Sequence, residues 1–175
     1  MKGCAKFLNF IGFLVFLLIL IAFLGACAAA AVVGIKPDLI PEDLLESLTS
    51  LTINGQPVTM EILTGFRIPC LILLGATIVF LLIGLFTIAN IRTALREVGR
   101  GEPFSVQCSK ALNTAAILEI ISGLIGIAIS IYSVYIFGGV SVDGGTVVTF
   151  SSNLSFILIA ILLKMLAGVS EFGRG

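Results

Sequence analysis

The chain has 175 residues, of which 58% are hydrophobic and only 11% are charged. An average soluble domain carries roughly 25% charged residues, so this composition argues against a soluble fold. Ten basic residues balance ten acidic ones and histidine is absent, which removes the usual neutral-pH acid–base group and the commonest metal ligand. We therefore expect a protein that is not an enzyme, that has no cofactor, and that binds no nucleic acid through a general basic surface.

The membrane spans are predicted from charge-free stretches, because roughly 20 apolar residues in a helix cross a bilayer core about 30 Å thick. Every span must be helical, since lipid offers no partner for backbone amides. The stretches predict four helices, over about 7–33, 68–91, 110–137 and 153–170. The expected fold class is an all-α membrane protein, with residues 1–175 forming one domain, a bundle of four transmembrane helices.

The orientation follows from the basic residues, which are enriched in short cytoplasmic loops. Lysine and arginine outside the spans gather at the N-terminus, in the loop 92–109 and in the tail, whereas acidic residues dominate the loop 34–67. We therefore expect both termini and the loop 92–109 on the cytoplasmic side of a bacterial cytoplasmic membrane. The loops 34–67 and 138–152 then lie outside.

The N-terminus also admits a second interpretation. The run Leu24-Gly25-Ala26-Cys27 resembles the cleavage box of a bacterial lipoprotein signal, and cleavage there would leave a lipidated cysteine and three spans. The apolar run continues past this box to Val33, which favours an uncleaved first span.

The cysteine spacing excludes one class of four-helix membrane enzyme. Thiol–disulfide enzymes need adjacent redox pairs, and no two cysteines here have C-x-x-C spacing. Cys27 and Cys70 could approach each other near the outer leaflet, but we expect them to act as small packing residues.

Both outer loops carry a turn dipeptide between β-branched residues. The dipeptides are Asn54-Gly55 and Asp143-Gly144, and each supplies the positive φ that a tight hairpin needs. An isolated hairpin is marginal in water, whereas several strands that share a face are stable. We therefore expect the two hairpins to pair into one small extracytoplasmic β-sheet.

Glu119 interrupts the third span and is the first candidate for function. An acidic group within a span costs roughly 2.5–3.5 kcal/mol on insertion scales and tends to face the bundle interior. It belongs to a stripe of small and polar residues, which also includes Ser122 and permits close packing of helices. Two interpretations stay open: a proton or ion site, or a structural carboxylate paired with a cation. We expect Glu119 to be buried and paired with Lys164, which lies at similar depth, or failing that with Arg92.

A second candidate is the arginine series that follows the second span. Arg92, Arg96 and Arg100 recur every fourth residue and are expected to line one face of a cytoplasmic extension of the helix. Contact with anionic lipid headgroups is one interpretation, worth about 1 kcal/mol per residue near the surface. A docking face for a cytoplasmic protein is the other. The expected partners are thus membrane lipids, and a protein partner or a second copy of the chain.

Two short motifs carry a family resemblance. They are Gly101-Glu102-Pro103-Phe104-Ser105 before the third span and the aromatic–glycine pair 172–173 at the end of the fourth. With the four spans, they resemble a bacterial membrane family catalogued as domain of unknown function 2975, over nearly the whole chain. The resemblance implies a small inner-membrane protein, often encoded beside a helix-turn-helix transcription regulator, without an established biochemical activity.

The first motif also has a structural explanation of its own. Pro103 breaks the chain after the second span, and Ser105 can cap the amino end of the third. The sequence as a whole predicts an integral membrane protein that acts by binding, as an accessory or regulatory membrane component. The alternative is a small proton- or ion-coupled transporter, or a channel subunit, that uses Glu119.

Overall fold

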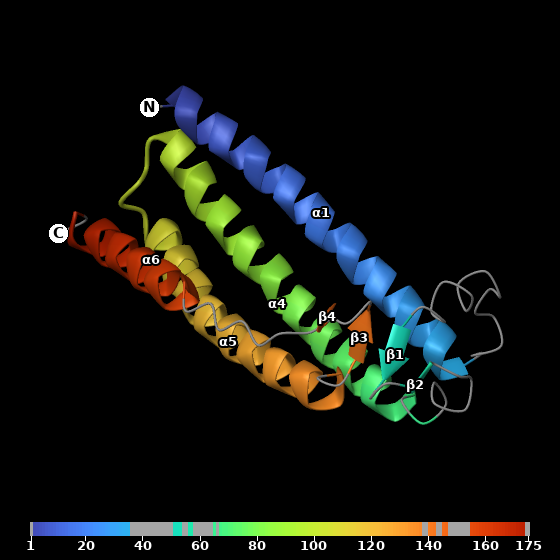
Figure 1. Cartoon of the computed structure of the whole chain (residues 1–175). Helices are drawn as coiled ribbons and strands as arrows, with labels where there is room; N and C mark the ends of the chain where they lie inside the picture. Colours follow the sequence, from blue (N-terminus) through green and yellow to red (C-terminus); the bar gives the residue numbers. More distant parts are fainter. Residues whose placement is uncertain are drawn as a thin grey trace. The chain divides into compact units, whose positions relative to one another are not determined.

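The computed structural model describes residues 2–35, 51–53, 56–57, 65, 67–137, 140–142, 145–146 and 155–173. Within these ranges the chain forms four long helices: α1 (Lys2–Ile35), α4 (Arg67–Arg100), α5 (Val106–Phe137) and α6 (Ser155–Phe172) (Figure 1). Each of the four contains a stretch long and apolar enough to cross a membrane. The architecture is that of a multi-pass integral membrane protein.

The chain groups into two compact units. One contains Met1–Phe23, Val79–Ile125 and Asn153–Gly175, and the other contains Leu24–Ile78 and Gly126–Ser152. Helices α1, α4 and α5 contribute residues to both units, whereas α6 belongs to the first unit alone. The first unit holds the candidate functional residues, and the second holds the strands.

Helix α4 continues past residue 91, where the expected span ends, and stops only at Arg100. The residues that follow Arg92 include Ala94, Leu95 and Glu97, which are good helix formers, so the charges end the apolar run without ending the helix. Helix α5 likewise begins at Val106 rather than at residue 110. The loop 92–109 is therefore mostly helical, as the spacing of its arginines indicated for the first half, and only a short turn separates α4 from α5.

This turn is fixed by hydrogen bonds at both of its ends. Gly101 has a φ of 91°, and its N–H donates to the carbonyl of Val98 at 3.1 Å. The N–H of Glu102 donates to the carbonyl of Glu97 at 3.0 Å, which completes a Schellman motif at the end of α4. The hydroxyl of Ser105 accepts the N–H of Cys108 at 3.1 Å, so the predicted N-cap of α5 is confirmed.

Helix α6 packs in the first unit through one face, while the rest of its surface is exposed. The buried residues recur at helical spacing and are Phe156, Ala160, Leu163, Ala167 and Ser170. Gly123 of α5 faces the ring of Phe156, and a Cβ on this glycine would collide with the ring. Small residues thus let α5 and α6 approach closely, as is usual between membrane helices.

The strands of the second unit form one small antiparallel sheet. Strand β1 (Leu51–Ile53) pairs with β2 (Gln56–Pro57) and with β3 (Val140–Val142), and β3 pairs with β4 (Gly145–Thr146). The order is β2-β1-β3-β4, with Thr52 opposite Ser141 at the centre. Segments far apart in the sequence are therefore joined by β1 and β3. The turn dipeptides 54–55 and 143–144 lie outside the described residues.

Arg67 ties the end of α1 to the start of α4 within the second unit. Its Nε donates to the carbonyl of Val33 at 3.2 Å, and its Nη2 donates to the carbonyl of Gly34. The last carbonyls of a helix have no partner inside the helix. The side chain of Arg67 supplies the hydrogen bonds that α1 itself cannot form.

Candidate binding site beside the turn between α4 and α5

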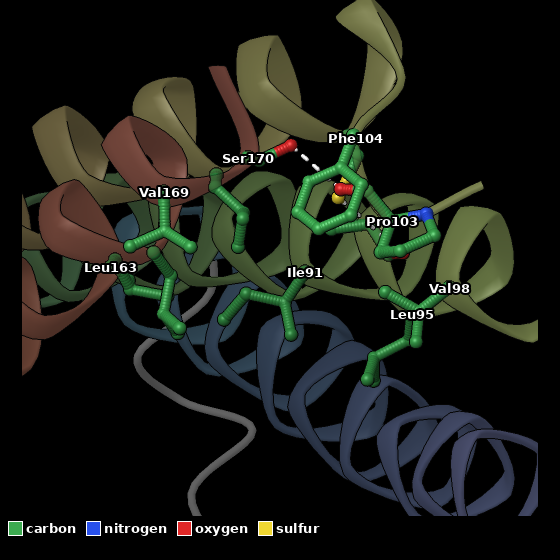
Figure 2. A pocket seen from close by; sticks show the side chains of 12 residues that line it. Ile91, Leu95, Val98, Pro103, Phe104, Leu163, Val169 and Ser170 are labelled. Atoms are coloured by element: carbon green, nitrogen blue, oxygen red, sulfur yellow. Dashed lines mark hydrogen bonds between the residues drawn. The ribbon is translucent and has the colours of Figure 1, made fainter. Parts of the chain in front are cut away.

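A pocket of about 300 Å³ opens in the first unit, beside the turn that joins α4 to α5. Three helices and the turn line it, as Figure 2 shows for Ile91, Leu95 and Val98 of α4, Pro103 and Phe104 of the turn, and Leu163 and Val169 of α6. These side chains are all apolar. At its mouth, Phe104, Leu166 and Val169 are 46%, 55% and 62% exposed, so an apolar ligand can reach the pocket from outside.

The two sequence motifs meet at this pocket. Phe104 comes from the turn motif, and its ring lies against Gly173 of the aromatic–glycine pair so closely that no Cβ would fit at residue 173. The hydroxyl of Ser170 donates to the carbonyl of Pro103 at 2.7 Å, which fastens α6 to the same turn (Figure 2). The turn and the end of α6 therefore build one wall together.

The polar groups of the lining are already engaged. The thiol of Cys108, which is 2% exposed, donates to the carbonyl of Ala94 at 3.9 Å, and the Ser170 hydroxyl is held by Pro103. A nucleophile needs an accessible group and a nearby base, and this pocket offers neither among its lining residues. Its chemistry suits the binding of an apolar group.

A buried carboxylate links α4 to α5 next to the pocket. The side chain of Glu97 is 5% exposed and accepts a hydrogen bond from Nη1 of Arg100 at 2.9 Å. Its other oxygen accepts from the hydroxyl of Ser105 at 3.4 Å, and this hydroxyl in turn caps α5. Sequence reasoning did not single out Glu97, although its i,i+3 spacing from Arg100 and the nearby cap residue were visible signals.

The three arginines of α4, which were expected to line one face of the helix, have different neighbours. The guanidinium carbon of Arg92 lies 5.2 Å from the ring centroid of Phe13 and 5.8 Å from that of Phe16, so this side chain packs on α1. Arg100 pairs with Glu97, and Arg96 is exposed. Every fourth residue of a helix advances by about 40°, which suffices to send the three side chains to different neighbours.

The side chain of Arg92 packs on α1 at a position where α1 has a glycine and two aromatic rings. The aliphatic part of its side chain passes over Gly12, where a Cβ would lie 3.1 Å from Cγ of Arg92. Its Nε is buried and finds no hydrogen-bond partner among the described residues. Among the described residues, the rings of Phe13 and Phe16 provide the favourable contact for its guanidinium group.

The predicted pairing of Glu119 is wrong. Among the residues that the structure describes, no ion pair joins Glu119 to Lys164 or to Arg92. The ammonium of Lys164 instead donates to Oδ1 of Asn113, on a different face of α5 and about 9 Å nearer its amino end than Glu119. Glu119 and its neighbour Ser122 are half-buried rather than buried. Similar depth did not ensure contact, because the two side chains also have to face each other around the helix axes.

Nothing in the described part of the chain resembles a metal centre, since no three His, Cys, Asp or Glu residues there lie close enough to hold an ion. No family model, curated protein or solved structure matches the chain. The family resemblance of the turn motif therefore stays a prediction.

Proposed function

We propose that this integral membrane protein acts by binding and not by catalysis, as an accessory or regulatory component of a bacterial cytoplasmic membrane. In this proposal the termini and the turn between α4 and α5 face the cytoplasm, and the strands lie outside. The distribution of lysine and arginine supports this orientation. The observation that carries the binding role is the apolar pocket beside the turn, whose polar atoms are engaged within the chain.

The occupant we assign to the pocket is an apolar side chain of a partner protein. A volume of about 300 Å³ lies at the low end for a ligand pocket and suits one or two side chains. Apolar anchors that fill such pockets dominate the energetics of protein interfaces. The exposed arginines 96 and 100 at the same end of α4 give the partner a charged surface beside the anchor site.

Photo-crosslinking in cells tests this function. Benzoylphenylalanine at Leu95, which lines the pocket, is expected to form an adduct with a discrete protein, whereas the same label at the exposed Phe86 outside the pocket is not. Val169→Trp, which fills the mouth, should abolish the adduct. Met165→Trp is the matched control, because Met165 is also exposed on α6 but does not line the pocket. Adducts with lipid alone would reject the protein partner.

Glu119 supports a second candidate function, that of a small proton- or ion-coupled transporter or channel subunit. The observation that favours it is the half-buried carboxylate within α5, which has no ion pair in the described ranges. An intramembrane acid of this kind is a starting point for a proton or ion pathway. Flux driven by a pH gradient into proteoliposomes, lost in Glu119→Gln and kept in Glu102→Gln, would establish transport. Equal flux in both variants and in empty liposomes would eliminate it.

A further inference from the structure

A second pocket, of about 290 Å³, lies between α5 and α6 and differs from the first in being polar. Its lining includes Ser109, Lys110 and Asn113 from α5, and Lys164 and Glu171 from α6. The binding role proposed above does not involve it. The charges of the lining decide which class of ligand fits.

The lining favours an anion. Two lysines from two helices stand against one glutamate, so the pocket carries a net positive charge. One of the three N–H groups of the Lys164 ammonium is used on Oδ1 of Asn113, which leaves two for a ligand. The amide nitrogen of Asn113 adds further donors beside it. Such a set of ammonium and amide donors matches the oxygens of a phosphate group.

The surface that continues from this pocket toward the middle of the spans is apolar. On α5, Ile117, Ile121 and Leu124 follow Lys110 at helical spacing and are 51%, 41% and 59% exposed. On α6, Ile161 and Ile157 continue from Lys164 in the same way and are also exposed. Each lysine therefore stands at the end of an apolar stripe. A ligand that fits both features has an anionic head and a long apolar tail.

We propose that the pocket between α5 and α6 binds the phosphate of an anionic phospholipid, whose acyl chain follows the two apolar stripes. Basic pockets between membrane helices recognise such headgroups, and the long stems of the lysines let their charges reach the membrane surface. The site is distinct from the arginines of α4, where the sequence suggested lipid contact. It does not depend on the partner-binding role of the first pocket.

Lipid binding by the purified full chain tests the proposal. Native mass spectrometry in detergent, with added phosphatidylglycerol or phosphatidylcholine, measures how tightly each lipid is held. We expect a preference for phosphatidylglycerol, and a loss of affinity of about fivefold each in Lys110→Gln and Lys164→Gln. Lys164→Arg, which keeps the charge, should retain most of the binding and shows that the fold tolerates a change at this position.

Two controls separate lipid binding in this pocket from general electrostatic attraction and from the binding of a free phosphate. Arg96→Gln removes one positive charge outside the pocket and should leave the affinity unchanged; an equal loss there would mean that general electrostatics, and not the pocket, holds the lipid. Competition with glycerol phosphate and inorganic phosphate identifies the source of the anion. Full displacement of the lipid by either one at equal concentration would overturn the assignment, since the apolar stripes would then contribute nothing.

Discussion

The ring of Phe104 covers the backbone of Gly173 so closely that residue 173 has no room for a side chain. This contact joins the turn after α4 to the end of α6, and it places the ring in the wall of the apolar pocket. The two motifs of the family resemblance are therefore two halves of one contact. The two motifs are far apart in the sequence, yet they have one structural role in common.

Gly173→Ala is expected to destabilise the first unit by about 1 kcal/mol, because the new methyl group must push the Phe104 ring outward. Gly168→Ala is the matched control. It adds the same methyl group to α6 at a position with nothing within 4 Å, and alanine is the better helix former. Thermal unfolding in detergent should separate the two variants. Equal stability would mean that the ring gives way without cost.

Glu97 and Arg100 differ in burial, so removing the charge of one should not cost the same as removing the charge of the other. Arg100 is 63% exposed and Glu97 only 5%, so Arg100→Gln leaves a buried carboxylate without its cation, whereas Glu97→Gln leaves a cation in solvent. An uncompensated buried group costs about 1–3 kcal/mol, so we expect Arg100→Gln to be the more destabilising change. The double variant should be closer to the wild type than Arg100→Gln alone. Denaturant unfolding measures all three, and the reverse order would contradict the assigned burial.

The aromatic site of Arg92 can be measured with a double-mutant cycle. Phe16→Leu keeps the apolar volume nearly constant but removes a ring 5.8 Å from the guanidinium carbon. We expect it to cost about 0.5–1 kcal/mol in the wild type and close to nothing in an Arg92→Met background. The coupling energy is calculated from the unfolding free energies of the wild type, the two single variants and the double variant. A value near zero would show that the ring acts on α1 by packing alone.

The sheet and the proposed orientation are tested together by a disulfide. Thr52 and Ser141 stand opposite each other in β1 and β3, so cysteines at these two positions should crosslink in an oxidising compartment. Thr52 and Thr146 belong to strands on either side of β3 and should not crosslink. The native cysteines are replaced by alanine in both variants. Crosslinking of the first pair only after cell lysis would place the sheet in the cytoplasm.

The helices could be predicted from the sequence because an apolar stretch of sufficient length is a local property. The cap at Ser105 was predictable for the same reason, since the capping hydroxyl and the N–H that it accepts are only three positions apart. The continuation of α4 past residue 91 was predictable too, because Arg92, Arg96 and Arg100 recur at helical spacing and good helix formers stand between them. For this segment, helical spacing and propensity were better guides than hydropathy, which ended the span at residue 91.

The sites could be predicted only in part, since they depend on angles between helices. The similar depth of Lys164 and Glu119 in the membrane predicted a contact between them, but Lys164 contacts Asn113 on another side of α5. The apolar pocket was not predicted, because it forms only where α6 meets the turn after α4. A spacing in the sequence fixes the position of a residue along its own helix, and the neighbouring helix decides which side chain it meets.

The contact of Arg67 with α1 has a consequence for the order of biogenesis. The carbonyls of Val33 and Gly34 receive their hydrogen bonds from a residue that leaves the ribosome more than thirty positions later. Until that residue arrives, the last carbonyls of the first helix take their hydrogen bonds from water at the membrane surface. Insertion of the second helix replaces this water with a side chain, so the first helix gains its final hydrogen bonds only when the second is in place.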